Sequence, residues 1–486
     1  MKWVPLLLLH LYALSLFSRV VHVGAGFAIA SPANLQGQLK AGDTALIHAG
    51  NYTGTFFLSN LSGTASAPIV IKSVLNEMVV FTGGTESFHF SNVSYLEIAD
   101  LIIEKQSGNG LNMDDGGSLS NPSHHITVRN CIFRNINATG NNDLLKLSGI
   151  DDFIVQDCIF QKGSPGGSGV DMVGCHRGLF IRNKFSDQGS NSIQIKGGSE
   201  NISITQNSFI NGGARALNIG GSTGLEFFRP QNATFEASRI TVYANVFEGG
   251  ETPFAFVGAI HSIVFNNTII RPGKWAMRIL QETVNANRFE PSGKDSVVNN
   301  LFIINNNVGT EVNIGPNTAP HTFYYSNNLW FKENQNNWAG PSSLPTTDTK
   351  QIIGNPQLDF NTYRSGNPSL LIQKGKTVRN NVKDYTNTDY KSPPSIGAIE
   401  INVTTTPIGI QEKSSTRVYP NPGNNQITIE VTAAGAYLMY DATGKRIQSG
   451  KLVKGINRIV LNDIDSGIYF IKIGPLSNEI IKWIKA

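Results

Sequence analysis

The sequence has little charge, few cysteines and no long hydrophobic run beyond its N-terminus. Of its 486 residues 15% are charged, the formal net charge is +4, and there are three cysteines, Cys131, Cys158 and Cys175. An odd cysteine count argues against a disulfide framework, and no Cys/His spacing fits a zinc site. The mild and unclustered positive charge argues against a nucleic-acid partner but is compatible with an anionic polymer. No later apolar run is long enough to span a membrane.

One apolar run stands at the N-terminus. Met1-Lys2-Trp3 is followed by a mainly apolar stretch that ends at Phe17, which is the pattern of a signal peptide rather than of a membrane anchor. Small residues favour cleavage near Val23-Gly24-Ala25, with Ala28-Ile29-Ala30 as the alternative. The sequence therefore predicts a signal peptide over residues 1–25 and a secreted protein.

Gly, Asn, Ser and Thr are abundant, which favours short strands and turns over helices. A signature of β-branched or apolar residues followed by Asn-x-(Ile/Phe) recurs along the chain. Its Asn or Asp stands at positions 130, 157, 183, 207, 245, 267, 300 and 328, at spacings of 27, 26, 24, 38, 22, 33 and 28. Repeats of this length, made of strands without helices, indicate a parallel β-helix whose coils must stack to bury their inner faces.

Stacking brings equivalent residues of neighbouring coils to about 4.8 Å from each other. Side-chain amides at the repeated position can then bond along the stack as a ladder. Cys131 and Cys158 share one register, so we expect a stacked pair of small core residues, with a bridge between them as the lesser alternative.

Two stretches carry a resemblance to known proteins. Ala41-Gly42-Asp43-Thr44, Gly50-Asn51-Tyr52-Thr53-Gly54 and Ala67-Pro68-Ile69-Val70-Ile71 resemble the first coil of chondroitinase-B-like and alginate-lyase-like proteins. Pro394-Ser395-Ile396-Gly397-Ala398-Ile399-Glu400 resembles their closing segment. Over residues 26–400 the chain is thus similar to the right-handed parallel β-helix proteins, a superfamily dominated by polysaccharide lyases and glycoside hydrolases. Such a resemblance speaks for the fold more than for the substrate.

The composition changes after Glu400. Residues 401–415 have the composition of a linker, and residues 416–486 predict a small antiparallel β-sandwich with Gly/Asn/Asp turns. Val418-Tyr419-Pro420-Asn421-Pro422, the Asp441–Gly444 turn, Gly467–Ile473 and the basic last residues closely resemble the type IX secretion C-terminal sorting domain of Bacteroidetes. This resemblance implies a Gram-negative source, passage through the periplasm, the type IX machinery as partner, and release or display outside the cell. A generic β-sandwich binding module is the alternative.

One strand of each coil alternates regularly. These strands are Leu111–Asp114, Leu145–Ser148, Val170–Val173, Ile193–Lys196, Leu217–Gly220, Phe254–Val257 and Met277–Leu280. Alternation places the first and third members in the core and the second and fourth outside. The second members form an outward row of Asn112, Lys146, Asp171, Gln194, Asn218, Ala255 and Arg278. The fourth members include Asp114, Ser148 and Lys196, and two residues before the strands stand Asn109, Asp143, Asn191 and Arg215.

The spacing of 38 residues marks an insertion at Gly220–Pro230. Insertions in solenoids cluster on the binding face. Phe227 and Phe228 suit stacking on sugar rings, or alternatively tuck the loop onto the helix, and Arg229 suits clamping an acid. Trp275 flanks the face as a sugar platform or a core lid. The predicted substrate-binding residues are Asp143, Gln194, Asn218, Arg229, Trp275 and Arg278.

A lyase that acts on a uronate polymer must neutralise the carboxylate, remove the C5 proton and protonate the leaving oxygen. Lys146, Lys196, Arg215 and Arg278 supply cations on neighbouring coils, and a lysine among cations has a lowered pKa and can act as the base. Chondroitinase-B-like and alginate-lyase-like enzymes carry a lysine on one coil and an arginine on the next, where this chain has Lys196 and, approximately, Arg215. The predicted catalytic residues are Lys196, Arg215, Lys146 and Asp171.

A glycoside hydrolase needs two carboxylates, about 5 Å apart for retention or about 6.5–9.5 Å for inversion. Asp143 and Asp171 are the best such pair, followed by Asp114 and Asp115. The Asp-Asp pair and the Gly-His-Gly of polygalacturonase-like proteins are absent from the corresponding coils. His176 stands in a turn and is expected to be structural or solvated.

Part of the resembling group binds calcium through acids just before the lysine, where this chain has Asn191, Ser192 and Gln194. We therefore predict no metal ligand and no firm cofactor, with calcium as an unmatched alternative. The prediction is a monomeric secreted polysaccharide lyase that cleaves an anionic, uronate-containing polymer by β-elimination. The alternatives are a hydrolase or epimerase of the same fold and a non-catalytic glycan-binding or adhesin surface.

Overall fold

The computed structural model describes residues 18–402, 417–431, 434–442, 445–461, 464–473 and 480–485. The chain divides into two compact units, Met1–Ile401 and Asn402–Ala486. The described residues form strands, turns and the short 3₁₀ helices η1 (Pro32–Leu35), η2 (Leu225–Phe227), η3 (Pro320–Thr322) and η4 (Pro368–Leu370), with no α-helix among them. Nothing helical in this described part has the length and apolar character needed to cross a membrane.

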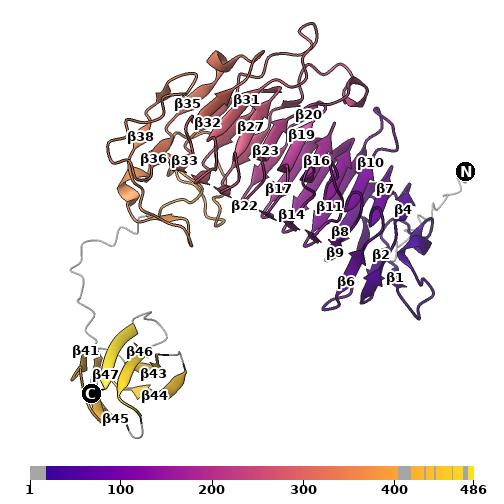
Figure 1. Ribbon diagram of the computed structural model, residues 1–486. Helices are drawn as coiled ribbons and strands as arrows, with labels where there is room; N and C mark the ends of the chain where they lie inside the picture. The colour runs from indigo at the N-terminus through magenta and orange to yellow at the C-terminus, as the bar shows by residue number, and fades with distance from the viewer. Residues whose placement is uncertain are drawn as a thin grey trace, which may run out of the picture. The chain divides into compact units, whose positions relative to one another are not determined.

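The first unit winds through parallel sheets A, B and C, and a typical coil contributes one strand to each (Figure 1). Sheet A holds β1 (Val20–Val23), β2 (Thr44–Ile47), β5 (Ile69–Ser73), β8 (Ser94–Ala99), β11 (Ser123–Arg129), β14 (Ile150–Gln156), β17 (His176–Ile181), β21 (Ser203–Thr205), β25 (Thr241–Tyr243), β29 (Ile263–Phe265), β32 (Ser296–Val298), β35 (Tyr324–Ser326) and β37 (Asp348–Thr349). Its side branch holds β20 (Ser199–Glu200), β24 (Ala237–Ser238) and β28 (Ala259–Ile260).

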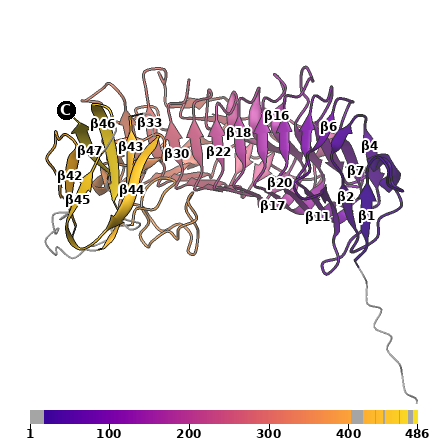
Figure 2. The same ribbon diagram turned by 90° about the horizontal axis from the view of Figure 1, so that it is seen from below.

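Sheet B holds β3 (Gly50–Tyr52), β6 (Val79–Thr82), β9 (Ile102–Glu104), β12 (Ile132–Arg134), β15 (Ile159–Gln161), β18 (Lys184–Ser186), β22 (Ser208–Ile210), β26 (Val246–Glu248), β30 (Thr268–Ile270), β33 (Leu301–Ile304), β36 (Leu329–Lys332) and β38 (Ile352–Ile353). Sheet C holds β4 (Phe56–Ser59), β7 (Phe88–Ser91), β10 (Leu111–Asp114), β13 (Leu145–Ser148), β16 (Ser168–Val173), β19 (Asn191–Lys196), β23 (Arg215–Gly220), β27 (Phe254–Val257), β31 (Met277–Leu280) and β34 (Val312–Ile314). The coils follow one another in chain order along the stack (Figure 2), so the parallel β-helix expected from the repeat is confirmed.

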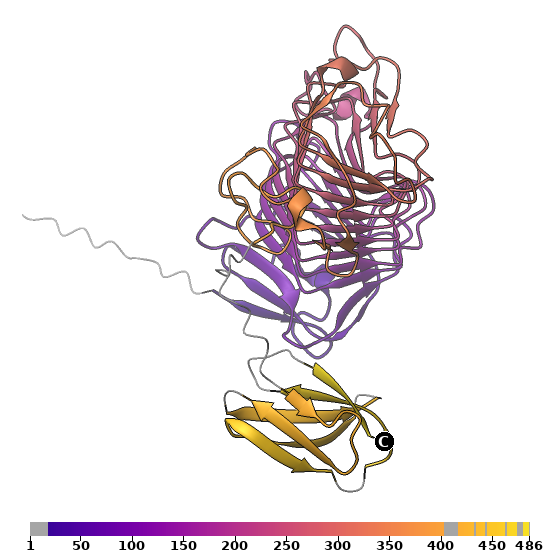
Figure 3. The ribbon, with the colours of Figure 1, turned by 90° about the vertical axis from the view of Figure 1, so that its left-hand side faces the viewer.

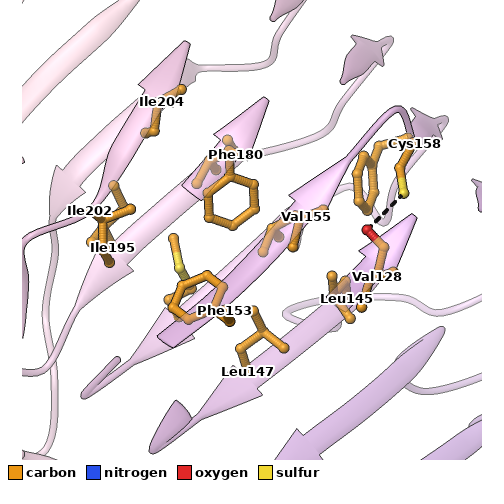
Figure 4. Packing of buried hydrophobic residues seen from close by; sticks show 14 of the residues in the cluster. Val128, Leu145, Leu147, Phe153, Val155, Cys158, Phe180, Ile195, Ile202 and Ile204 are labelled. Atoms are coloured by element: carbon orange, nitrogen blue, oxygen red, sulfur yellow. Dashed lines mark hydrogen bonds between the residues drawn. The ribbon is translucent and has the colours of Figure 1, made fainter. Parts of the chain in front are cut away.

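Stacked side chains of the same kind fill the interior. Phe133, Phe160, Phe185, Phe209 and Phe247 form a continuous column, with successive ring centroids 4.7 to 5.0 Å apart. Aliphatic residues of sheets A and C point into the same core, which is drawn in Figure 4. Because every coil repeats the inward pattern, each ring contacts its equivalent in the next coil, and the core runs unbroken along the stack.

An asparagine ladder runs beside this column, as the repeat predicts. Each Nδ2 donates to the Oδ1 of the next member at 2.9 to 3.1 Å, and the members are Asn183, Asn207, Asn245, Asn267, Asn300 and Asn328. These side chains are buried, so the ladder satisfies amides that water cannot reach.

The predicted ladder register is wrong by one residue in two coils. The backbone N–H of Cys158 donates to Asn183 Oδ1 at 3.0 Å, so Cys158, and not Asp157, stands at the ladder position. Asp157 and Asn130 instead occupy the preceding turn position at φ values of 55° and 53°, which Asn and Asp tolerate well. Cys131 and Cys158 are free and buried, so no bridge joins them. Cys158 donates to the carbonyl of Val128 at 3.6 Å (Figure 4).

The described fold starts earlier than expected. β1 pairs in parallel with β2, and Val23 is fully buried in the core. β1 lies within residues 1–25, which the sequence assigns to a signal peptide, so a cleavage at Val23–Ala25 would remove a strand of sheet A. Residues 1–17 and nearly all of the predicted linker lie outside the described residues.

The last turns of the first unit include a short antiparallel pair, β39 (Leu358–Asp359) and β40 (Arg364–Ser365). The second unit contains β41 (Arg417–Tyr419), β42 (Gln426–Val431) and β45 (Gly455–Val460) in one antiparallel sheet, and β44 (Arg446–Leu452), β43 (Gly435–Asp441), β46 (Gly467–Ile473) and β47 (Ile480–Lys485) in another. It has its own core, which includes Met439, Ile471 and Trp483. This arrangement agrees with the predicted small β-sandwich, seen at the yellow end of the chain in Figure 3.

Candidate functional site

Sheet C aligns the polar residues that alternation places outside. The strand register pairs Asn112, Lys146, Asp171, Gln194, Asn218, Ala255 and Arg278 in succession, as the alternation predicts. Asp171, Asn218 and Ala255 are nevertheless buried, so only part of this row reaches the surface. The second row is confirmed from Asp114 through Ser148 and Val173 to Lys196. After Gln194 the register shifts, and Ile195 pairs with Gly220. The second row therefore ends at Lys196. On the next coil, the insertion begins at Gly220, the last residue of β23.

The two predicted lysines meet at one carboxylate. Lys146 donates a short hydrogen bond to Asp171 Oδ2, and Lys196 Nζ lies 3.4 Å from the same oxygen. The side chain of Asp171 is only 3% exposed, while those of Lys146 and Lys196 are 22% and 13% exposed. Burial lowers the pKa of Lys146, but the charges of Asp171 and Asp143 outweigh burial and raise it. Lys146 is therefore held in its charged form.

Asp143 lies behind this cluster. Its Oδ1 accepts a hydrogen bond from the N–H of Ser168 at 2.8 Å, and its Oδ2 lies 3.9 Å from Lys146 Nζ. Burial, followed by the charge of Asp171, raises the pKa of Asp143 to about 7. The Asp143 side chain is 4% exposed. It therefore stabilises the charge of Lys146 from the buried side and offers little surface to a substrate.

A cavity of about 600 Å³ opens over the C-terminal ends of β13, β16 and β19. Both lysines line it, and the loops that follow β10 and β23 form its sides. Its lining includes Asp115, Leu119, Lys146, Ser148, Lys196, Thr223, Glu226, Phe227 and Arg229. The insertion predicted at Gly220–Pro230 thus stands over the predicted lysines, and the volume is within the range of ligand pockets.

Two buried carboxylates hold the insertion in place. Glu236 accepts hydrogen bonds from the N–H of Thr223 at 3.0 Å and the hydroxyl of Thr223 at 2.7 Å, and also from the N–H of Gly197 at 2.8 Å. Arg229 forms an ion pair with Asp151, 78 residues earlier in the chain, and donates to Gly174 O at 2.8 Å. Because the loop is bonded to three coils, its residues keep their positions over the cavity.

Arg229 was predicted to clamp a substrate acid, but its guanidinium is already engaged by Asp151 and by His176 Nδ1 at 2.9 Å. His176 is accordingly structural, and its Nε2 donates to the carbonyls of Gly198 and Arg229. The Arg229 and His176 contacts, followed in size by their charges, outweigh burial and lower the pKa of Asp151. Arg229 touches the cavity mainly as part of the loop that bounds it.

The two adjacent phenylalanines of the insertion differ in burial. Phe228 is fully buried and packs with Ala233 and Phe289, so it tucks the loop onto the coils. Phe227 is 59% exposed and lines the cavity. The structure thus shows Phe228 tucking the loop onto the coils, and it leaves the ring of Phe227 exposed at the cavity.

The remaining predicted residues form a second cluster farther along sheet C. Arg215 forms an ion pair with Glu282 at 2.7 Å and donates to Asn218 Oδ1 at 3.1 Å. Arg278 lies over the ring of Trp275, 4.4 Å from its centroid, and donates to Asn313 at 2.9 Å. Burial and the nearby charge of Arg215 lower the pKa of Arg278.

None of Arg215, Asn218, Trp275 and Arg278 lines the cavity, so they are separate from the lysine pair. Gln194 lies between the two groups and accepts a hydrogen bond from Asn191 at 3.4 Å. In the part of the chain that the structure describes, no group of three or more His, Cys, Asp or Glu side chains could hold a metal ion.

Sequence reasoning missed three features of the site: the cavity itself, the carboxylates that anchor the insertion, and the place of Asp115. The sequence predicts Asp115 only as part of a hydrolase pair, whereas the structure places it in the lining of the cavity. The glycine at position 149 is the sequence signal for the position of Asp115. Gly149 has a φ of 68°, and a Cβ there would come within 2.2 Å of Asp115 Oδ2.

Comparison with known proteins gives matches for two regions. Residues 86–237 match the family model described as right handed beta helix region, and residues 417–485 match that of the secretion system C-terminal sorting domain. The predicted order of a right-handed β-helix and a C-terminal sorting domain is therefore confirmed. No curated protein matches the chain.

Several solved structures are similar to this chain at low identity. Pectate lyase Pel9A is 15% identical, with 79% of this chain and 97% of that chain covered and a TM-score of 0.49. An alginate lyase from Paenibacillus sp. str. FPU-7 is 15% identical, with coverages of 63% and 97% and a TM-score of 0.40. The A-module of mannuronan C-5 epimerase AlgE4 from Azotobacter vinelandii is 13% identical, with coverages of 65% and 89% and a TM-score of 0.37.

Proposed function

We propose that this protein is a secreted polysaccharide lyase that cleaves an anionic, uronate-containing polysaccharide by β-elimination. One observation carries the proposal: Lys146 and Lys196 share Asp171 Oδ2 and both line a cavity of about 600 Å³. Two ammonium groups beside one pocket suit a ligand that brings its own carboxylate. Neutralising that carboxylate stabilises the negative charge that develops when the C5 proton leaves.

The two lysines receive different roles. Lys146, whose pKa is raised beside Asp171 and Asp143, stays protonated and pairs with the uronate carboxylate. Lys196, whose Nζ lies 3.4 Å from Asp171 Oδ2, is the base that takes the C5 proton. Phe227, exposed on the insertion, stacks on a sugar ring. Arg215, Trp275 and Arg278 contact the polymer outside the cavity, and the buried Asn218 accepts the hydrogen bond that holds Arg215.

A glycoside hydrolase of the same fold is the second candidate. The raised pKa of Asp143, about 7, would suit a general acid. However, neither Asp143 nor Asp171 lines the cavity, and both side chains lie behind Lys146. The lyase is favoured because its proposed base and its carboxylate-binding cation both reach the cavity. An epimerase would remove the same C5 proton but would give a product without a new double bond. A glycan-binding surface would bind the polymer without forming any product.

The match of the second unit to a sorting domain supports a proposal on how the protein is exported. We propose that residues 417–485 direct the protein to the type IX secretion machinery of a Gram-negative bacterium of the Bacteroidetes. An N-terminal signal peptide would first take the chain to the periplasm, and the sorting domain would take it across the outer membrane. The protein then acts outside the cell or on its surface as a monomer.

The test exposes the purified full-length chain to alginate, pectate, glycosaminoglycans and neutral glycans. Ultraviolet absorbance reports new unsaturated uronates, and a parallel assay reports reducing ends. A lyase raises both signals on an acidic polymer. Reducing ends without absorbance would transfer the assignment to the hydrolase, and binding without either signal would leave a glycan-binding surface.

Variants then assign the residues. Lys196→Ala is expected to lower kcat by at least about 100-fold, the usual worth of a positioned base. Lys184→Ala is the matched control, because Lys184 is an exposed lysine on β18 of sheet B. An unchanged rate in Lys196→Ala would remove Lys196 from the mechanism.

A further inference from the structure

The cavity contains two carboxyl groups that the lyase roles leave unused, those of Asp115 and Glu226. Glu226 is on the exposed insertion, whereas Asp115 follows β10 directly and is only 9% exposed. β-Elimination needs a proton for the leaving oxygen as well as a base for C5. Of the two carboxyls, Asp115 is the one that is buried beside a strand of sheet C.

Asp115 has a fixed position. Its Oδ1 accepts a hydrogen bond from the N–H of Gly117 at 2.9 Å, which orients the carboxyl group. Its Oδ2 occupies the space beside Gly149, where a Cβ would come within 2.2 Å. Gly149 adopts a φ of 68°, which favours glycine, so the backbone of the next coil leaves room for this carboxyl group.

Both lysines line the same cavity as Asp115. Lys196 Nζ and Lys146 Nζ both reach Asp171 on β16, while the Asp115 carboxyl lies beside Gly149 at the end of β13. The carboxyl therefore lies farther along the strand direction than the ammonium groups. A sugar chain bound in the cavity would meet both the cations and this carboxyl group.

The surroundings of Asp115 raise the pKa of its carboxyl group above the ordinary value. Burial raises its pKa most strongly, the Gly117 N–H opposes this, and the charge of Asp114 adds to it. The more distant charge of Arg229 acts in the opposite direction, but Arg229 is paired with Asp151. Asp114 itself is held by His89 at 2.6 Å and by Ser91 at 2.6 Å and does not line the cavity.

We propose that Asp115 is a further catalytic residue, the general acid that protonates the glycosidic oxygen as it leaves C4. This inference rests on the proposed lyase function. Lys196 takes the C5 proton, and the electron pair of the C5–H bond forms the C4–C5 double bond. The C4–O bond breaks with its pair moving to oxygen, which receives the Asp115 proton. Solvent then takes one proton from the lysine and returns one to the carboxylate.

The experiment compares two leaving groups on the full-length chain. Asp115→Asn is measured on the natural polymer and on a synthetic uronoside that carries fluoride at C4, which departs without a proton. On the polymer, kcat is expected to fall about 100- to 10,000-fold, the usual range for a lost general acid. On the fluoride the loss is expected to stay below about tenfold, because only the acid step is removed. An equal loss on both substrates, or no loss on the polymer, overturns the inference.

Two further variants test the acid role at other positions, with the folded fraction of each variant measured first by thermal unfolding. Glu226→Gln removes the other cavity carboxyl, and a selective loss on the polymer there instead would transfer the acid role to Glu226 and overturn the inference. Gly149→Ala keeps the Asp115 carboxyl but displaces it, and it should reproduce the leaving-group pattern of Asp115→Asn. The high-pH limb of the polymer profile should disappear in Asp115→Asn. If the unaltered chain yields no unsaturated product from any polymer, the lyase proposal itself fails.

Discussion

Lys196 Nζ lies 3.4 Å from Oδ2 of Asp171, the oxygen that also accepts the hydrogen bond of Lys146. A single carboxylate thus holds two cations that would otherwise repel each other. Since Asp171 is almost completely buried and the lysines reach the cavity, the negative charge stays inside and the positive charge faces the ligand.

The first prediction concerns the loss of that charge. Asp171→Asn leaves two ammonium groups side by side without a carboxylate between them. Breaking a buried ion pair on one side usually costs about 3–5 kcal/mol, and the partial exposure of the lysines favours the lower end. Urea unfolding measures the loss. Asp187→Asn, at an exposed aspartate after β18, should change the free energy of unfolding by less than about 0.5 kcal/mol. Equal losses in both variants would show that Asp171 does not hold the lysines.

The second prediction concerns pH. The pKa of Asp143 is raised from 3.8 to about 7 in the folded protein, so the folded state binds its proton more tightly than the unfolded state. Its contribution to stability is fully present below pH 3.8 and is lost as the pH rises through about 7. Asp143→Asn does not titrate. The free energy of unfolding of this variant, relative to the parent, should therefore increase between these pH values, as followed by urea unfolding at several pH values. A difference in the free energy of unfolding that stays constant with pH would contradict this prediction.

The third prediction separates two neighbouring residues. Phe228→Ala opens a space in the buried contact with Ala233 and Phe289 and is expected to cost about 3–5 kcal/mol. Phe227→Ala removes an exposed ring and is expected to change stability by less than about 0.5 kcal/mol while raising KM. Thermal unfolding and steady-state kinetics on one polymer measure both. If Phe227→Ala leaves KM unchanged, the ring does not contact the sugar.

The fourth prediction concerns the N-terminus. Chains that start at Ser18 and at Gly26 differ by β1, whose Val23 is buried, and by the ion pair between Arg19 and Asp43 at 2.7 Å. Removing β1 uncovers the edge of β2 and part of the core, so the shorter chain should unfold at a lower temperature. N-terminal sequencing of the secreted protein should accordingly place its first residue before Val20. A mature protein that begins at Gly26 with unchanged stability would contradict both expectations.

The candidate site could be predicted only in part. The outward row on sheet C follows from alternation within each strand, which is a local property of the sequence. Alternation therefore predicts the register positions of Lys146 and Lys196, which the strand pairing confirms. The partners of Arg229 could not be foreseen, because Asp151 stands 78 residues away and comes beside it only when the coils stack. Phe227 and Phe228 are adjacent and have nearly the same local sequence. Which of the two side chains is buried depends on the residues that pack behind the loop.

The amino-acid sequence by itself determined the β-helix, its order of coils and the sandwich at its end. Strand alternation, repeat length and turn residues act over short distances, and stacking follows because one coil cannot bury its inner face alone. Tertiary structure alone decided that Arg229 anchors a loop and that Asp115 shares a cavity with two lysines. Each of these depends on contacts between coils, where a shift of one residue changes which side chains meet.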